Sequence, residues 1–202
     1  TLGEDGATHQ TMEDIALMKA LPNMTVLVPC DYNQARLATL AAARLNGPVY
    51  LRLGRSKMPN FTDDNDTFVI GKAQLLNEGT DVSIIACGHL VWEAIEAARA
   101  LEAEGISAEV INMHTIKPLD TDAILATARK TRAIVTCEEH LFNGGLGDSV
   151  AQTLALHCPT PMEYVAVNDR FGESGTPDEM LTNYGLRATN IIDKVHAVLK
   201  RK

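Results

Sequence analysis

The sequence lacks an excess of basic residues. Its 18 lysines and arginines stand against 26 aspartates and glutamates, which gives the 202 residues a formal net charge of −8. A nucleic-acid-binding protein usually needs a basic face, so this balance argues against that class. No apolar run approaches the roughly 18 residues that a membrane span requires, and no charged-then-apolar leader opens the chain. We therefore expect a soluble, cytoplasmic protein that binds neither nucleic acid nor membrane.

Cysteine pairs of the metal-binding or redox-active kind are also lacking. None of the four cysteines belongs to a CxxC pair, and three of the four end or follow short apolar runs. We expect small buried hydrophobic residues in a reducing compartment rather than metal ligands or disulfide partners. The chain lacks an initiator methionine as well, and we expect it to be part of something longer. The cysteines are Cys30, Cys87, Cys137 and Cys158.

Strand and helix patterns alternate along the chain on both sides of a polar stretch at residues 59–66. Upstream, residues 25–28 and 49–51 predict two short strands, and Asp31 is a suitable N-cap for the helix between them. One face of that helix carries Leu37, Leu40, Ala41 and Leu45. A two-stranded parallel piece cannot cover both of its faces, so we expect residues 1–55 to pack on material outside this chain or on a partner.

Downstream of the polar stretch the alternation is more regular and predicts a complete domain. Its expected strands cover residues 82–86, 108–111, 133–136 and 162–165, and its expected helices cover residues 91–101, 120–128, 147–156 and 189–200. Strands and helices that alternate with short connections give a parallel sheet with right-handed crossovers. We therefore expect an α/β protein with three parts, namely residues 1–58, a linker at 59–70 and a complete α/β domain at 71–202.

The densest cluster of polar side chains lies at residues 3–10 (GEDGATHQ), just before an apolar-periodic run. A helix that starts near Thr8 would place His9 in its first turn and Asp5 in the loop before it. An aspartate beside a histidine suits hydroxyl recognition or proton transfer, because the pair offers an acceptor and a group that titrates near neutral pH. A solvated turn with a capping threonine explains the pattern equally well, so spacing alone leaves both interpretations open.

Two arginines, Arg52 and Arg55, directly follow the second strand. They lie at its carboxyl end, where open α/β sheets bind ligands. Alternation along the chain sends them in different directions, so we do not expect them to share a ligand. An arginine at this place could hold a phosphate through paired hydrogen bonds. The alternative is an ion pair between domains, for which Arg52 is a good candidate.

Two polar, glycine-containing segments lie further along the chain. Residues 143–149 follow Glu138, Glu139 and His140 and could cradle an anion at a helix start, but they fit neither GxGxxG nor the P-loop pattern. A tight turn with a helix starting near residues 148–149 is the favoured interpretation. Residues 170–175 (RFGESG) predict a polar loop before Pro177, which opens a short helix. The remaining histidines show no ligand spacing and are expected to be structural or solvated: His89, His114, His157 and His196.

Several of these motifs, in this order, resemble those of transketolases. The matching segments are residues 3–10 (GEDGATHQ), 22–24 (PNM), 28–31 (VPCD), 53–59 (LGRSKMP), 170–175 (RFGESG) and 184–186 (YGL). Because the resemblance covers essentially the whole chain, it implies the C-terminal half of the enzyme, which some microbes encode as a separate subunit. It identifies residues 1–58 as the end of a pyrimidine-binding domain. Residues 71–202 then form the complete C-terminal α/β domain, with a parallel sheet of mixed edge.

Residue roles follow from the resemblance at the matching positions. Transketolases move two carbons from a ketose phosphate to an aldose, with thiamine diphosphate as electron sink. The family's EDG aspartate, here Asp5, contacts a substrate hydroxyl near the reacting carbon. Its THQ histidine, here His9, contacts sugar hydroxyls and the carbonyl oxygen at the reacting end. The arginine of the loop, here Arg55, binds the sugar phosphate. The resemblance thus implies His9 and Asp5 as catalytic residues, and all three as substrate-binding residues.

Residues that bind thiamine diphosphate and Mg²⁺ are expected outside this chain. In the family, the glutamate and aromatic residues around the aminopyrimidine precede the position of Thr1, and the Mg²⁺ and diphosphate ligands belong to the N-terminal half. One spacing imitates the metal motif, because residues 4–6 (EDG) are followed after 26 residues by Asn33. We reject this site, since Glu4 replaces the motif's first glycine and Asn33 follows an N-cap. No metal site is expected in this chain.

Partners are implied in the same way. The family's active site forms between two halves across a dimer. We therefore expect an N-terminal transketolase half as partner, a homodimer of this half, sugar phosphates as ligands, and no activity of the chain alone. Deoxyxylulose-phosphate synthases share the DG-x-TH and PNM motifs, but Glu4, Gln10 and the FGESG loop favour transketolase. The β-subunits of 2-oxoacid dehydrogenases are a more distant alternative, and a non-catalytic dimerisation or regulatory module is an alternative of another class.

Overall fold

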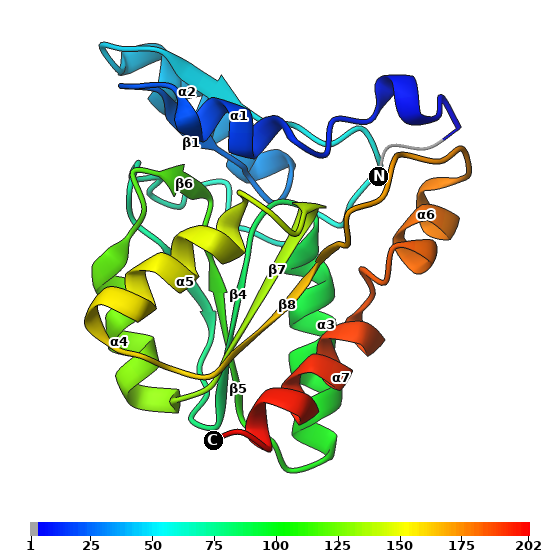
Figure 1. Ribbon diagram of the computed structural model, residues 1–202. Coiled ribbons are helices and arrows are strands. Elements are labelled where there is room, and N and C mark those ends of the chain that lie inside the picture. Colours follow the sequence, from blue (N-terminus) through cyan, green and yellow to red (C-terminus); the bar gives the residue numbers. More distant parts are fainter. Residues whose placement is uncertain (1–3) are drawn as a thin grey trace.

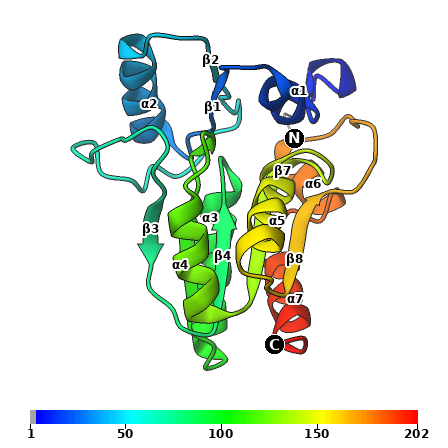
Figure 2. The same ribbon diagram turned by 60° about the vertical axis from the view of Figure 1, so that its left-hand side comes forward.

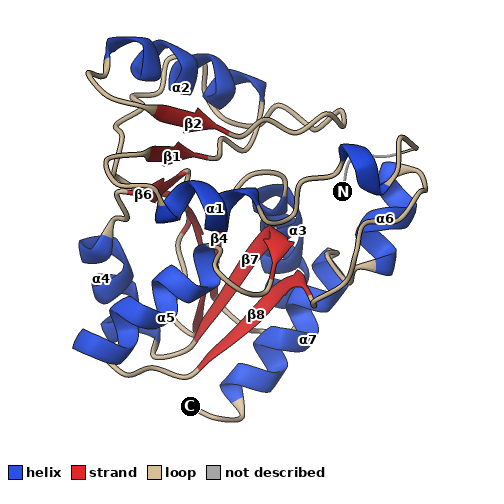
Figure 3. Ribbon diagram, turned by 45° about the horizontal axis from the view of Figure 1, so that its top comes forward, coloured by secondary structure: helices blue, strands red, loops and turns tan. Residues whose placement is uncertain are grey.

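Two β-sheets organise the computed structural model, which describes residues 4–202 (Figure 1). The smaller sheet has three strands in the order β2-β1-β6. β1 (Thr25–Leu27) runs parallel to β2 (Val49–Leu51), and β6 (Thr115–Lys117) pairs with β1 in antiparallel orientation. Figure 3 shows these strands side by side beyond the end of the larger sheet. The small sheet therefore takes its third strand from the C-terminal part of the chain, which the sequence pattern does not predict.

The larger sheet has five strands in the order β3-β5-β4-β7-β8. β3 lies at one edge and runs antiparallel to β5, whereas the pairs β5-β4, β4-β7 and β7-β8 are parallel. This sheet confirms the α/β class and the parallel arrangement with a mixed edge. The strands are β3 (Gln74–Asn77), β4 (Val82–Ala86), β5 (Ala108–Asn112), β7 (Ile134–Leu141) and β8 (Met162–Val167).

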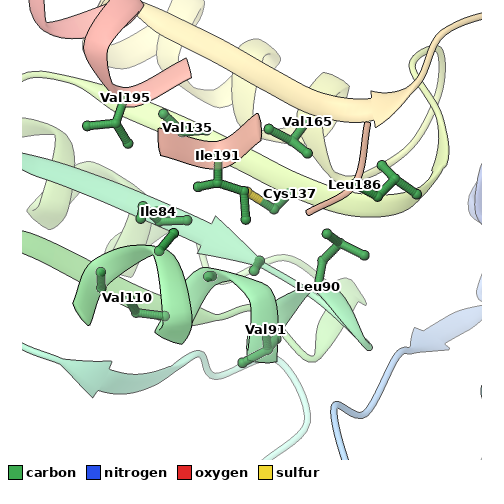
Figure 4. Close-up of a cluster of buried hydrophobic side chains, with 14 of the residues drawn as sticks. Ile84, Leu90, Val91, Val110, Val135, Cys137, Val165, Leu186, Ile191 and Val195 are labelled. Carbon is green, nitrogen blue, oxygen red and sulfur yellow. The ribbon is translucent and has the colours of Figure 1, made fainter. Parts of the chain in front are cut away.

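Helices cover both faces of the larger sheet (Figures 1 and 2). The four helices are α3 (Leu90–Ala103), α4 (Thr121–Thr131), α5 (Leu146–His157) and α7 (Ala188–Leu199). α3 and α7 pack on one face over a core that includes Ile84, Val135 and Ile191 (Figure 4), and α4 and α5 pack on the other. Fully burying one aliphatic side chain contributes about 1.5–3 kcal/mol, so these layers stabilise the domain. None of the helices in residues 4–202 is long and apolar enough to cross a membrane.

A second hydrophobic core joins the N-terminal segment to the C-terminal domain. Ile15, from α1 (Asp14–Ala20), and Val26, from β1, belong to the same buried cluster as Ile116 of β6 and Leu146 of α5. The sequence predicts that residues 1–55 need material outside this chain. The structure shows that the described part of this segment also packs on the chain's own C-terminal domain.

The apolar face expected on α2 (Tyr32–Arg44) is not fully covered. The buried residues of this helix are Gln34 and Ala38, while Leu40 and Leu45 remain 45% and 39% exposed. The helix therefore packs on the described residues through a neighbouring face, and part of its leucine face stays exposed.

Helix starts agree with the sequence where a local side chain determines them. Asp31 accepts the backbone N–H of Gln34 at 2.9 Å, and Asp120 starts α4 in the same way. Such caps contribute about 1 kcal/mol each. Pro177 opens α6 (Pro177–Asn183), as expected. These caps were predictable because their partners lie within one helical turn.

The sequence leaves open whether a helix or a solvated turn lies near Thr8, and the structure shows a turn. A single 3-10 turn, η1 (Ala7–His9), lies at this place, and α1 begins only at Asp14. The extended backbone of Gln10, with φ −106° and ψ 120°, ends the turn. The Gln10 side chain bonds to a distant loop, so tertiary contacts rather than local propensity shape this segment.

Candidate functional site

Asp5 and Arg55 form an ion pair between two loops. Asp5 precedes η1, and Arg55 lies in the loop that follows β2. Their side chains are 36% and 66% exposed, so an incoming ligand can reach both. The structure thus brings together a carboxylate and a guanidinium that lie 50 positions apart in the sequence.

His9, the third predicted site residue, lies in the exposed turn η1 close in sequence to Asp5. Its Nδ1 lies 2.9 Å from the hydroxyl oxygen of Thr8. Within residues 4–202, no hydrogen bond or ion pair joins His9 to Asp5 or Arg55. The imidazole is therefore accessible, and its predicted contacts would be with substrate rather than with these two side chains.

Arg52 turns inward and joins the two parts of the chain. Its Nε donates to Oδ2 of Asp14 at 2.8 Å, and its Nη2 donates to the carbonyl oxygens of Thr11 and Glu139 at 2.9 and 2.8 Å. Burial opposes the charge of Arg52, but Asp14 and Glu139 outweigh this effect and raise its pKa. Burial and a hydrogen bond to Asp14 raise the pKa of Tyr50 to about 12. The ion pair of Arg52 with Asp14 therefore lies within residues 1–58, and its hydrogen bond to the Glu139 carbonyl reaches the C-terminal domain, while Arg55 is more exposed.

Two adjoining pockets open beside the Arg55 loop. One has a volume of about 290 Å³ and includes Arg52 and Glu139 in its lining, and the other has about 520 Å³ and includes Arg55 and Lys57. Both pockets are lined by Pro29, Leu53, Gly54 and His89. They lie at the carboxyl ends of β1 and β2, where open α/β sheets bind ligands.

His89 is a residue that the sequence pattern does not assign to the site. It lines both pockets, its side chain is 11% exposed, and its Nδ1 lies 3.5 Å from Oε2 of Glu139. Burial lowers the pKa of His89, although Glu139 opposes this effect. The sequence feature that points to His89 as a site residue is its place just after β4, at the carboxyl end of a parallel strand.

The glycine-rich turn at residues 143–149 already holds an anion of the chain itself. The carboxylate of Glu138 accepts the N–H groups of Leu146 and Gly147 at 2.7 and 2.8 Å. A Cβ at Gly145 would lie 2.0 Å from Oε2 of Glu138, so no space remains for a ligand there. The tight-turn interpretation is confirmed, although α5 begins at Leu146, slightly earlier than expected.

The residues that the structure describes do not form a metal site. Within residues 4–202, no group of three or more histidine, cysteine, aspartate or glutamate side chains is placed to hold a metal ion. Asn33, the residue of the imitated metal spacing, donates its side-chain amide to the carbonyl oxygen of Thr62 at 2.5 Å. Asp5 is engaged by Arg55. The described residues therefore offer no side-chain cluster that fits the Mg²⁺ of a thiamine cofactor.

Comparison with known families gives two matches that together span most of the chain. Residues 1–61 match the pyrimidine-binding domain of transketolase, and residues 71–191 match the transketolase C-terminal domain. The chain is also 45% identical over 198 residues to the 6-deoxy-6-sulfo-D-fructose transketolase subunit SqwH of Clostridium sp. (strain MSTE9), a match that covers 98% of this chain and 62% of that relative.

Further relatives show the same pattern. A putative transketolase C-terminal section from Methanocaldococcus jannaschii is 40% identical over 205 residues, covering 100% of this chain and 64% of the relative. A 1-deoxy-D-xylulose-5-phosphate synthase from Heliobacterium modesticaldum is 36% identical over 195 residues, covering 94% of this chain and 30% of the relative.

The fold matches a solved structure with a TM-score of 0.91 and 44% identity, over 96% of this chain and 63% of that one. That structure is described as a split gene transketolase, inactive beta4 tetramer. The chain spans about three fifths of the length of its first two relatives and of this structure. It matches the pyrimidine-binding and C-terminal domains of transketolase, and it belongs to the transketolase family.

Proposed function

We propose that this chain is the C-terminal part of a thiamine-diphosphate-dependent transketolase that moves a two-carbon ketol unit between sugar phosphates. Family membership supports the transferase class, and transketolases use thiamine diphosphate with a divalent metal. The chain's contribution is to bind and orient the sugar, because correct orientation of reacting groups supplies a large part of catalysis.

The observation that carries this proposal is the ion pair between Asp5 and Arg55, in which Arg55 lines the larger of the two pockets. A guanidinium binds a phosphate through two parallel charge-assisted hydrogen bonds, and a carboxylate accepts hydrogen bonds from sugar hydroxyls. When a sugar phosphate binds, Arg55 exchanges Asp5 for the phosphate, and Asp5 becomes free for a hydroxyl. In the absence of a ligand, the ion pair thus holds Arg55 and Asp5 at the site, where one can bind the phosphate and the other a hydroxyl of a phosphorylated sugar.

His9 completes the set on the turn next to Asp5. Its imidazole is exposed, and its ring nitrogens can donate to a sugar carbonyl oxygen and donate to, or accept from, a sugar hydroxyl. We assign it hydrogen bonding at the reacting end of the sugar, with proton transfer to the same oxygen.

A partner supplies what this chain does not contain. We propose that an N-terminal transketolase half holds thiamine diphosphate and Mg²⁺, that the complete enzyme is a cytoplasmic assembly built on a dimer of this half, and that this chain alone is inactive. Two relatives are named as a subunit and as a C-terminal section, and the similar solved structure is an inactive tetramer of a split-gene transketolase, which supports this arrangement.

The test is reconstitution with the N-terminal half, followed by Arg55→Ala. We expect the KM for phosphorylated sugars to rise about 10- to 100-fold, as for a lost charge-assisted pair, while the KM for a non-phosphorylated sugar stays unchanged. Arg36→Ala is the matched control, because it breaks another exposed ion pair, with Asp64 at 3.1 Å, away from the pockets. An unchanged KM in Arg55→Ala, or ketol transfer by the purified chain alone, would contradict the proposal.

A deoxyxylulose-phosphate synthase is the second candidate, supported by relatives that are 36–37% identical. The same reconstituted enzyme separates the two functions by its product. Formation of 1-deoxy-D-xylulose 5-phosphate would favour the synthase, and a ketose lengthened by two carbons would favour the transketolase. If Asp5, His9 and Arg55 variants leave all kinetics unchanged while assembly is intact, the chain is a dimerisation or regulatory module.

A further inference from the structure

The RFGESG loop at residues 170–175, which belongs to the C-terminal domain, packs against the turn that carries His9. Figures 1 and 3 show η1 beside the segment that precedes α6. The side-chain Nε2 of Gln10 donates to the carbonyl oxygen of Glu173 at 2.8 Å, across 163 positions of sequence. Gln10 is 8% exposed, so this hydrogen bond is shielded from water and its loss is costly.

Two glycines allow this close approach. A Cβ at Gly172 would lie 2.5 Å from Oε1 of Gln10 and 2.8 Å from Cα of Ala7. A Cβ at Gly6 would lie 2.5 Å from the hydroxyl oxygen of Ser174, and Gly6 has a φ of 76° that side chains rarely adopt. The loop therefore contacts the turn both before His9 in the sequence, at Gly6 and Ala7, and after it, at Gln10.

The loop is itself held firmly by α6 and its neighbours. Arg170 pairs with Glu173, donates to the carbonyl oxygen of Asn183 at 3.1 Å, and lies over the ring of Tyr184 at 5.3 Å. The hydroxyl of Tyr184 donates to the carbonyl oxygen of Phe171 at 3.2 Å. These bonds make the loop a fixed support. The three residues of η1, by contrast, are too few to be stable as a helix on their own.

We propose that Gln10 is a positioning residue that fixes His9 by tying its turn to the carbonyl of Glu173 in the C-terminal domain. This assigns the RFGESG loop a role at the site, although none of its side chains needs to touch substrate. The kinetic consequence rests on the proposed function of His9, whereas the structural coupling does not.

The first experiment measures hydrogen exchange of the purified full chain, without any activity assay. Gln10→Glu keeps the length of the side chain but replaces the donor by a carboxylate that repels the Glu173 carbonyl. We expect amides in residues 6–11 and 170–175 to exchange about tenfold faster, as for the loss of one buried hydrogen bond. Gln152→Glu makes the same change on the exposed side of α5 and should leave both segments unchanged. Unchanged exchange in Gln10→Glu overturns the proposal.

A second variant tests the same contact from the other side. Gly172→Ala introduces a methyl group against Gln10 and Ala7, so it should raise exchange in residues 6–11 although the Gln10 side chain is intact. If the turn exchanges as in the unmodified chain, the loop does not support it and the proposal fails.

The third experiment uses the enzyme reconstituted with the N-terminal half. At neutral pH, Gln10→Glu should raise the KM for sugar about tenfold with unchanged assembly, because His9 is misplaced. Burial raises the pKa of a carboxyl group, and a protonated carboxyl can again donate to the Glu173 carbonyl. The defect should therefore shrink as the pH falls, which a merely structural role would not produce. A pH-independent defect contradicts positioning by this bond. If the unmodified enzyme transfers no ketol unit, the proposed function fails, and hydrogen exchange still decides the coupling.

Discussion

The imidazole of His89 lies directly against Gly54. A Cβ built on Gly54 would lie 2.0 Å from Nε2 and 2.1 Å from Cε1 of His89. Gly54 immediately precedes Arg55, and His89 lies just before α3 of the C-terminal domain. The contact is therefore a further place, besides the Gln10–Glu173 and Arg52–Glu139 bonds, at which the C-terminal domain touches a loop of the candidate site. The conformation of the arginine loop depends on the absence of a side chain at Gly54.

We predict that Gly54→Ala destabilises the protein by about 1–3 kcal/mol, the usual cost of overpacking. His89→Ala in the same chain should recover most of this loss, because it removes the ring that the new methyl group meets. Urea unfolding of both single variants and the double variant measures the coupling. Additive effects would show that the clash with His89 is not the cause.

Arg52 gives a prediction about the junction between the two parts, because it pairs with Asp14 of its own part and also donates to the Glu139 carbonyl of the C-terminal domain. Arg52→Ala should destabilise the chain by about 3–5 kcal/mol, since it leaves Asp14 buried with an uncompensated charge. Arg36→Ala breaks the exposed pair with Asp64 and should cost less than about 1 kcal/mol. Chemical unfolding of both variants checks the contrast. Similar small effects would mean that the Arg52 pair does not hold the junction.

The sequence predicts those features of the fold whose causes are local. The strand β4 (Val82–Ala86) is an apolar run, and Asp31 and Asp120 cap helices through amides three positions away. β6 was not predictable in this way, because Thr115–Lys117 is short, contains a charged residue, and becomes a strand only by pairing with β1.

The candidate site divides along the same line. Motif resemblance points to Asp5, His9 and Arg55, but their spacing cannot show that Asp5 and Arg55 meet. His89 stands alone in the sequence, and its neighbour Gly54 is separated from it by the whole linker. The sequence allows the turn at residues 143–149 to be an anion cradle, but the side chain of Glu138 occupies it. This occupation depends on a contact between β7 and the helix that follows it, α5. In each case the missing information is tertiary.

His114 gives a prediction of pH dependence. It is 4% exposed, stacks on Phe68 with ring centroids 4.1 Å apart, and burial lowers its pKa to about 4, with Asp120 acting in the opposite direction. In the unfolded chain the His114 side chain takes up a proton near pH 6.5, whereas in the folded chain it stays neutral down to about pH 4. Above pH 6.5 both states are neutral, so the folded state has its full stability there. The contribution of His114 is lost as the pH falls from about 6.5 towards 4, with a total of about 3 kcal/mol.

Unfolding free energies at several pH values between 7.5 and 4 check this. His114→Gln should flatten the decline in this window, whereas His157→Gln, at an exposed position, should leave it unchanged. An equally steep decline in His114→Gln would assign the pH dependence to other groups.

Asp31 caps α2 and also fastens the linker to it. Its carboxylate, 7% exposed, accepts the backbone N–H of Gln34 at 2.9 Å, those of Phe61 and Thr62 at 2.9 and 2.7 Å, and the Thr62 hydroxyl at 2.7 Å. A lone helix cap contributes about 1 kcal/mol, whereas Asp31→Ala removes four charge-assisted bonds, so we expect a loss of about 3 kcal/mol or more. Thr176→Ala removes an exposed cap and is the matched control, with an expected loss of about 1 kcal/mol. Urea unfolding measures both, and proteolysis at residues 59–66 should accelerate only in Asp31→Ala. Equal losses and equal cleavage rates would mean that Asp31 caps the helix without holding the linker.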